Sequence, residues 1–151
     1  MDQWNSVDEI LDFAIKNEEQ AETLYNDLAE RADSPAMQTV FKDFAREERG
    51  HKAKLLGAKQ SGNVETEAGK ITNLKIGDYL MDVEPAANLS YQDTLILAMK
   101  AEKAAFRLYV DLAAETADPD LTDLLLALAQ EEAKHKLRFE VEYDEQILTE
   151  N

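Results

Sequence analysis

Cysteine is absent from this chain of 151 residues, and glycine and proline are scarce. The lack of cysteine excludes disulfide bonds, thiol catalysis, iron–sulfur clusters and metal sites built from four cysteines. Any bound metal must therefore use oxygen and imidazole nitrogen as ligands. With five glycines, three prolines and 44% apolar residues, the composition is typical of neither a disordered chain nor a turn-rich β-fold.

Long hydrophobic runs are missing as well. No apolar stretch approaches the ~18 residues that a membrane-spanning helix requires, and residues 1–4 lack the basic-then-apolar pattern of a secretory signal. The formal net charge is −16, and a surface of this sign repels nucleic acid. Part of the acidic excess is interpreted as a solvated face, and the alternative is that it attracts cations or a basic electron-transfer partner. We predict a single cytoplasmic domain over residues 1–151, with no membrane and no nucleic-acid partner.

The chain matches itself when it is shifted by 84 residues. Comparison of residues 11–55 with residues 95–139 gives 16 identities in 45 positions without a gap, far more than composition explains. The sequence therefore predicts a duplicated unit. The identities include Glu18/Glu102, Tyr25/Tyr109, Pro35/Pro119, Glu47/Glu131, Glu48/Glu132 and His51/His135.

Each copy of the repeat is expected to form two helices, because a capping residue precedes each stretch of helical apolar periodicity. Ser34-Pro35, for example, supplies an N-cap followed by a proline at the first helical position. The turns between paired helices are short, so the partners must lie antiparallel. The predicted hairpins cover residues 6–60 and 90–147, with helices that begin near Ser6, Ser34, Ser90 and Asp118. The fold class is an all-α four-helix bundle made of two duplicated antiparallel hairpins.

Residues 61–89 form a long crossover between the hairpins and contain three of the five glycines. A connection of this length can traverse the bundle or reach a neighbouring subunit. We therefore expect a homodimer and leave open whether the hairpins are swapped between its subunits. Six residues of the crossover are apolar enough to pack against the bundle: Ile71, Leu74, Ile76, Tyr79, Leu80 and Met81.

The inward stripe of every predicted helix is apolar except at one level near its middle. Mid-helix residues of antiparallel partners sit at a common height, so the interrupting groups should meet in the core. Because burial of four ionised carboxylates is prohibitive on its own, the cluster needs either protons or cations. The interrupting residues are Glu18, Glu48, His51, Glu102, Glu132 and His135.

Two divalent cations would suit this cluster, since their charge of +4 cancels −4 from the four glutamates and neutral imidazoles complete the coordination. The Glu-x-x-His spacing places both side chains on one helix face, within reach of one ion. The chain has only two histidines, and both have a glutamate three residues earlier, a coincidence of roughly one in seventy by composition. We predict a pair of iron ions; manganese is chemically permitted and zinc fits less well.

Neighbouring residues on the helices allow more than one role. Glu19, Glu47 and Glu131 are interpreted as solvated, and so is Glu22, although its position four residues after Glu18 also allows an approach to the ions. Tyr25 and Tyr109 each follow a candidate ligand by seven residues. They are either core aromatics or phenols that hydrogen-bond a ligand glutamate and so contribute to catalysis.

These residues resemble the rubrerythrin branch of the ferritin-like di-iron carboxylate superfamily over about 110 residues. By this resemblance the six residues named above are the metal ligands, and Glu48 and Glu132 bridge the ions. Two features depart from the family pattern. The chain has no Cys₄ rubredoxin domain, and Ala105 stands where rubrerythrins have an additional glutamate, so the site is closer to a ferritin or bacterioferritin ferroxidase centre. The pattern that carries the resemblance is Glu18, Tyr25 and Glu48-x-x-His51, repeated as Glu102, Tyr109 and Glu132-x-x-His135.

The resemblance implies a di-iron oxidoreductase that reduces hydrogen peroxide with electrons from an external donor, such as a rubredoxin-like protein. Three other functions stay open from the residues. The first is a ferroxidase that uses dioxygen and handles iron, and the second is a structural module whose metals only hold the bundle together. The third is a di-iron oxygenase that acts on an organic substrate, for which the sequence shows no pocket.

Overall fold

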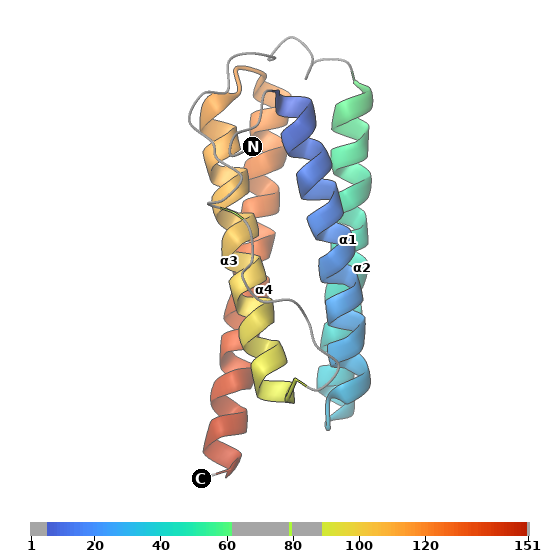
Figure 1. The fold of residues 1–151 in the computed structure, drawn as a ribbon, viewed down its shortest axis with the longest axis vertical. Helices are drawn as coiled ribbons and strands as arrows, with labels where there is room; N and C mark the ends of the chain where they lie inside the picture. The colour runs from blue at the N-terminus through green and yellow to red at the C-terminus, as the bar shows by residue number, and fades with distance from the viewer. Residues whose placement is uncertain (1–5, 62–78, 80–88, 151) are drawn as a thin grey trace.

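The computed structural model describes residues 6–61, residue 79 and residues 89–150. These residues form four helices (Figure 1). This arrangement confirms the predicted all-α bundle of two hairpins. The last helix was predicted to end near Ile147, but it continues for three more residues, to Glu150. The elements are α1 (Val7–Arg31), α2 (Pro35–Gln60), α3 (Tyr91–Glu115) and α4 (Pro119–Glu150).

Side-chain caps start the first three helices where the sequence places them. The Oγ atoms of Ser6, Ser34 and Ser90 each accept a hydrogen bond from the backbone N–H three residues later, at 3.2, 3.0 and 3.0 Å. Such a cap satisfies a donor that has no partner within the helix and contributes about 1 kcal/mol. In α4, an Asp118 oxygen accepts from the N–H of Asp120 at 3.1 Å.

The helices α1 and α2 form one antiparallel hairpin, and α3 and α4 form the other, side by side with it (Figure 1). Two apolar clusters fill the space between the hairpins. One contains Leu11 and Leu125, and the other contains Leu28 and Phe139. The ionisable level predicted from the sequence lies between these clusters, so it is closed by hydrocarbon at both ends.

Most of the crossover, residues 62–78 and 80–88, lies outside the described residues, and so do the predicted swap and five of the six apolar positions. Tyr79 is described, and its side chain is buried in the core cluster that contains Leu11. Its hydroxyl donates to an oxygen of Asp111 at 2.6 Å, and the Arg107 guanidinium lies 5.9 Å from its ring centre. This residue therefore packs against α3, as predicted for the apolar part of the crossover.

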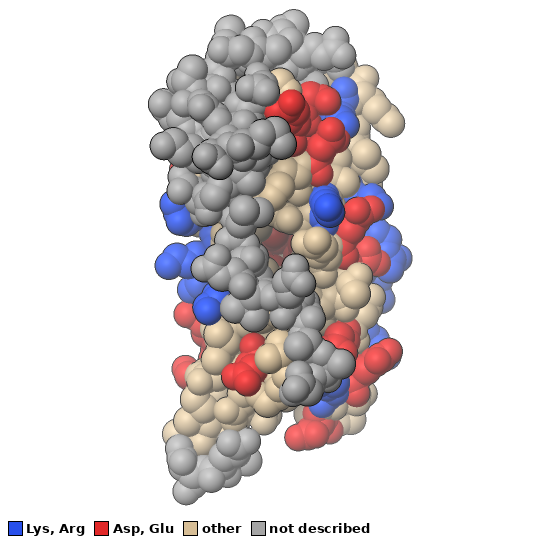
Figure 2. All heavy atoms as spheres, in the orientation of Figure 1, with Lys and Arg blue, Asp and Glu red and all other residues tan. Residues whose placement is uncertain are grey.

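Two further features of the surface follow from the helices. None of the helices in the described part of the chain is long and apolar enough to cross a membrane. On the face shown in Figure 2, acidic and basic side chains lie close together where the described helices are visible. Ion pairs also join α1 to α2, for example Lys52 with Glu19 at 2.5 Å.

Candidate metal centre

Six ionisable side chains meet at the middle of the bundle. Helices α1 and α3 each contribute one glutamate, and α2 and α4 each contribute a glutamate and a histidine three residues later. All six side chains are buried, with at most 2% of their surface exposed. They are the residues that the interrupted apolar stripes singled out: Glu18, Glu48, His51, Glu102, Glu132 and His135.

The six residues form two groups of four, and within each group the possible ligand atoms all lie within 4.8 Å of one another. The first group is Glu18, Glu48, His51 and Glu132; the second is Glu48, Glu102, Glu132 and His135. Glu48 and Glu132 belong to both groups. Two ions held in this way would share these two carboxylates, which is the geometry of a bridged dinuclear site.

The histidine rings turn their Nδ1 atoms toward the acids. Nδ1 of His51 lies 3.4 Å from Glu18 and 3.3 Å from Glu132. Nδ1 of His135 lies 2.9 Å from Glu48 and 3.6 Å from Glu102. The two rings are nearly parallel, with centres 6.2 Å apart and planes inclined by 13°. Each imidazole thus directs one nitrogen at its own group of carboxylates.

The buried atoms that lack partners are almost all in this cluster. Among the described residues, eight buried side-chain atoms have no hydrogen bond, and seven of them belong to the six residues. Each such atom costs about 1–3 kcal/mol if it stays unsatisfied, so the set requires bound cations or protons. The donor set of carboxylate oxygens and imidazole nitrogens therefore fits a pair of metal ions. The seven atoms are Glu18 Oε2, Glu48 Oε1 and Oε2, His51 Nδ1, Glu102 Oε2, Glu132 Oε1 and His135 Nδ1.

Burial and mutual repulsion shift the pKa values of the buried glutamates strongly. Burial, with the charge of Glu132 next in size, raises the pKa of Glu48 and of Glu102 well above the ordinary value. Burial and the charge of Glu18 raise the pKa of Glu132 to about 7. Glu18 differs: burial would raise its pKa, but the close approach of Glu48, the charge of His51 and the hydrogen bond from Tyr109 outweigh burial and lower the pKa. Without cations, the cluster therefore holds protons on some of its carboxyl groups.

The pKa values of the two histidines are shifted in opposite directions. At His51, burial lowers the pKa, but the close approach and the negative charge of Glu132 and Glu18 outweigh burial and raise the value to about 11. At His135, burial dominates and the charge on His51 adds to it, so the pKa is lowered. The metal-free site thus has one charged and one neutral imidazole. A bound cation needs both in the neutral form, so ion binding must expel a proton from His51.

We expect the metal-free protein to lose stability as the pH rises from 6.5 to 9. Above pH 6.5 the folded protein binds more protons than the unfolded chain, because the pKa values of Glu48, Glu102, Glu132 and His51 are all raised in the fold. The lowered pKa of His135 acts in the opposite sense only below its ordinary value of 6.5. Thermal unfolding with a chelator at several pH values measures this effect, and a melting temperature that rises over the window would contradict it.

Two buried tyrosines connect the hairpins through this site. The hydroxyl of Tyr25 on α1 donates to Oε1 of Glu102 on α3, and the hydroxyl of Tyr109 on α3 donates to Oε1 of Glu18 on α1 at 2.5 Å. Each phenol therefore holds the glutamate of the opposite hairpin and leaves the second carboxylate oxygen free. The sequence had left open whether these tyrosines were only core aromatics, and the contacts favour the hydrogen-bonding role.

Replacing either tyrosine by phenylalanine (Y25F or Y109F) should weaken metal binding by about tenfold, because a ligand glutamate loses the bond that orients it. The ring stays in place, so the fold should remain intact. Titration with ferrous or manganous ion, followed by calorimetry, measures the affinity. The matched control is Y143F on α4, because Tyr143 packs beside the core away from the six residues. Equal affinities for all four proteins would rule out the orienting role.

Two residues interpreted as solvated have a more specific position. Nε2 of His51 contacts the carboxylate of Glu131, and Nε2 of His135 lies 3.3 Å from that of Glu47. The acidic side chains are only 37% and 46% exposed, and each reaches from one hairpin to the other. Burial would raise the pKa of Glu131, but its bond to His51 lowers it. An acid on the outer nitrogen orients the imidazole and directs Nδ1 inward.

A signal for these acids was present in the sequence. Glu47 and Glu131 are identical across the repeat and directly precede the candidate ligands Glu48 and Glu132. By contrast, Glu22 does not join either group of four. Its carboxylate instead pairs with Arg49 of α2, at 2.8 Å.

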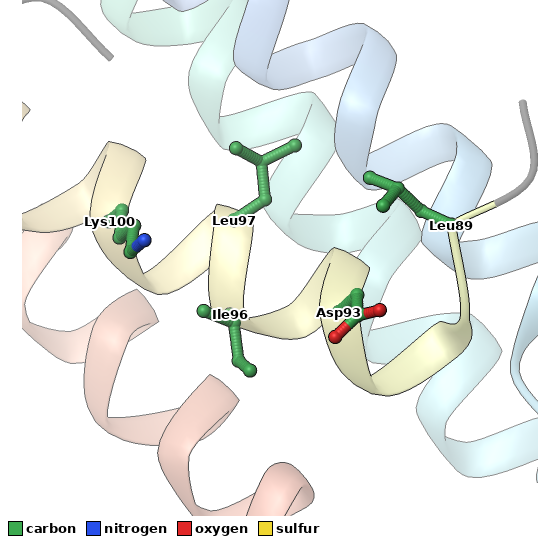
Figure 3. A pocket seen from close by; sticks show the side chains of 5 residues that line it. All are labelled: Leu89, Asp93, Ile96, Leu97 and Lys100. Atoms are coloured by element: carbon green, nitrogen blue, oxygen red, sulfur yellow. The ribbon is translucent and has the colours of Figure 1, made fainter. Parts of the chain in front are cut away.

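A surface pocket lies apart from the site. It has a volume of about 190 Å³ near the start of α3 and is lined by Leu89, Asp93, Ile96, Leu97 and Lys100 (Figure 3). None of the six candidate ligands lines it. This pocket therefore does not place an organic substrate next to the clustered glutamates and histidines.

Comparison with known proteins adds the family. The family model for rubrerythrin matches residues 9–143, which include both hairpins and all six clustered residues. The chain belongs to the rubrerythrin family. Its bundle carries two buried Glu/His groups of the kind that can hold a dinuclear metal site. Unlike rubrerythrins with a rubredoxin domain, this sequence contains no cysteine for a Cys₄ site.

Solved structures resemble this rubrerythrin-family chain along nearly its whole length. A hypothetical protein from Pyrococcus furiosus is 28% identical, with a TM-score of 0.73, and the match covers 92% of this chain and 89% of that one. A ferritin-like diiron-carboxylate protein from Thermotoga maritima is 22% identical, with a TM-score of 0.78 and coverages of 93% and 96%. An uncharacterized protein from Magnetospirillum magnetotacticum MS-1 is 24% identical, with a TM-score of 0.67 and coverages of 93% and 95%. None of the curated proteins matches the chain.

Proposed function

We propose that this rubrerythrin-family protein is a di-iron oxidoreductase that reduces hydrogen peroxide to water. The observation that carries the proposal is the set of seven unpartnered buried atoms on two groups of four residues that share Glu48 and Glu132. A bound ferrous pair would supply the two electrons that break the O–O bond, and with two protons each peroxide becomes two water molecules. An external one-electron donor, such as a rubredoxin-like protein, would then restore the ferrous state.

The residues of the chain would divide the work of holding such a pair. Glu48 and Glu132, which belong to both groups, would set the spacing of the ions as bridges. Glu18 with His51, and Glu102 with His135, would complete the two sites. The oxygen-rich set with one imidazole per ion favours iron, and manganese remains chemically acceptable.

The surrounding hydrogen bonds would keep this arrangement rigid during a redox cycle. Burial, followed by the charge of Glu18, raises the pKa of Tyr109 well above its ordinary value, so its phenol stays protonated and keeps donating to Glu18. Glu47 and Glu131 would fix the two imidazoles from the outside. Hydrocarbon above and below the cluster restricts the access of bulk water.

Peroxide turnover by the iron-loaded, pre-reduced protein tests the proposal. The wild type should consume peroxide, and the variant E48A/H51A should react at the rate of iron in buffer, because it lacks a bridge and a terminal ligand. A matched control is E19A/K52A, which removes an exposed ion pair from the same two helices. If the wild type consumed peroxide no faster than E48A/H51A, the peroxidase function would have to be abandoned.

A ferroxidase function is the second candidate, and a specific observation favours it. The two groups contain the same residue types, and Ala105 supplies no further carboxylate on α3. Such a symmetric site suits oxidation of ferrous ions by dioxygen followed by their transfer. Stopped-flow measurement of ferrous oxidation by dioxygen and by peroxide separates the two functions. A ferroxidase would use dioxygen at a comparable rate and release ferric ion, whereas a peroxidase would retain its iron and prefer peroxide.

A further inference from the structure

The outer face of α4 carries large apolar side chains that the bundle leaves exposed. Among the described residues, six large hydrophobic side chains are exposed, and four of them belong to α4. Leu126 is 43% exposed, Leu137 62%, Val141 40% and Leu148 75%. Their separations of eleven, four and seven residues bring them onto one face of the helix. They therefore form a stripe about 33 Å long, interrupted by the polar side chains of Gln130 and Asp144, which we call the α4 stripe.

The α4 stripe is not part of the core of its own bundle. The buried face of α4 is formed by residues such as Leu128, His135 and Phe139, which lie on the opposite side of the helix. Single exposed leucines are common on protein surfaces and need no explanation. Four on one helical face are different, because they make a seam of the kind that packs against another helix.

The internal repeat provides a comparison within the same chain. A shift of 84 residues places Lys42, Ala53 and Gly57 of α2 at the positions of Leu126, Leu137 and Val141. The equivalent positions of α2 are therefore a lysine and two small residues, and Leu148 has no counterpart in α2, which ends at Gln60. Since both helices occupy the same role in the bundle, the fold itself does not demand large apolar residues at these positions. The stripe is a property of α4 alone.

The length of α4 points in the same direction. It has 32 residues, whereas the other three helices have 25 or 26. Its C-terminal end extends beyond the other helices at one end of the bundle (Figure 1). Leu148 lies in this last part and is the most exposed of the four stripe residues. A projecting helical end with an apolar face can bury that apolar surface only against a partner outside the bundle.

We infer that the α4 stripe binds the α4 stripe of a second copy of this chain, antiparallel and around a twofold axis at Leu137. The register is self-complementary, as an isologous interface requires. Leu126 and Leu148 are equally far from Leu137 on either side, so each would meet the other residue of the partner subunit. Ala133 and Val141 are also equidistant, so a small side chain would face a larger one. The projecting end of each α4 would then cover the exposed part of the other copy's bundle.

The charge of the chain makes a distinctive prediction for this dimer. Each copy carries a formal charge of −16, so two copies repel each other. An apolar seam should therefore associate more tightly as salt screens the repulsion, whereas an interface held by ion pairs would weaken. Sedimentation at low and high salt should show a larger dimer fraction at high salt.

Single cysteines test the register directly, because the chain has none of its own. With helix axes about 8–10 Å apart, a residue on the twofold axis faces its own copy at a Cα separation of about 5 Å, within disulfide reach. Under mild oxidation L137C should form a covalent dimer. A mixture of L126C and L148C should give mainly the mixed dimer. The control is A53C on α2, at the position equivalent to Leu137, which should stay monomeric on a non-reducing gel.

A second variant keeps the test independent of cysteine chemistry. L137E should raise the dimer dissociation constant at least about tenfold by sedimentation, since it places two charges on the apolar axis, while A53E should change it little. Both sites are exposed, so circular dichroism should show unchanged helix content. A wild type that stays monomeric at high salt would overturn the inference. A dimer that persists in L137E, or cross-links as readily through A53C as through L137C, would overturn it equally.

Discussion

Replacing both shared glutamates by glutamine (E48Q/E132Q) is expected to raise the melting temperature of the metal-free protein and to abolish its response to metal. The two carboxyl groups lie among other acids in a dry core, and burial raises the pKa of both. At pH 8 the wild type must either ionise these buried carboxyl groups or keep them protonated at a low proton concentration, and both cost folding free energy. Glutamine keeps the shape and removes this cost.

The size of the effect follows from Glu132, whose pKa rises from 4.5 to about 7. A shift of that size corresponds to about 3 kcal/mol at a pH above the folded value, which in a chain of 151 residues is about 6–12 °C in melting temperature. The wild type should recover stability only when metal is added, by about 3 kcal/mol at a hundredfold excess over the dissociation constant. The variant should show no such increase, since both ions lose their bridges.

Melting curves with chelator and with excess ferrous or manganous ion measure both parts of this prediction. The matched control is E47Q/E131Q, which removes the same number of charges one residue earlier on each helix. These acids are partly exposed and contact imidazole, so their neutralisation should not raise the metal-free melting temperature. A metal-free E48Q/E132Q protein less stable than the wild type would contradict the repulsion on which the metal site is inferred.

Alanine at either histidine should abolish peroxide turnover and reduce the bound metal from two ions to one. H51A removes the only imidazole of the first group, and H135A that of the second, whereas the shared glutamates remain for the other ion. Peroxide needs two electrons, so one ion cannot complete the reaction. Each variant should therefore lose at least about a hundredfold in turnover, and H51A/H135A should lose no more than either single variant.

Metal analysis of the purified variants together with single-turnover peroxide assays checks this expectation. Multiplicative losses in the double variant, or retention of two ions in H51A, would show that the groups do not act as one dinuclear unit. The contrast with Y25F and Y109F is informative, because those variants lose only an orienting bond and should keep both ions at high metal concentration.

Much of the site was predictable from the chain because its chemistry conflicts with its position. Glu18 and Glu102 interrupt apolar helical stripes, and a charge that is buried in an apolar core needs a compensating group. The Glu48-x-x-His51 spacing and its repeat then specify which residues share a helix face. Which atoms are left without partners could not be predicted, because that depends on ring orientation and on contacts across the bundle. The single domain stays a prediction. Iron as the metal and the ligand role of each residue stay predictions until bound metal is measured.

The acids Glu47 and Glu131 show what a sequence pattern leaves out. They occupy flanking positions on their helices, which usually face water, and this explains the interpretation that they are solvated. In the fold they contact the histidine of the opposite hairpin. The opposite pKa shifts of His51 and His135 likewise have no counterpart in the repeat, since both histidines occur in the same local pattern. At His51 the contacts with Glu132 and Glu18 outweigh burial, whereas at His135 burial dominates.

By itself the sequence determined the number of helices, their caps at Ser6, Ser34 and Ser90, and the level at which ionisable groups enter the core. These are local properties, since periodicity and capping act within a few residues. Only the tertiary structure decided that each tyrosine holds the glutamate of the other hairpin, which buried atoms are left without partners, and that four large apolar side chains of α4 stay exposed on the described bundle. Those facts depend on how the two hairpins pack against each other, and no spacing along one helix contains that information.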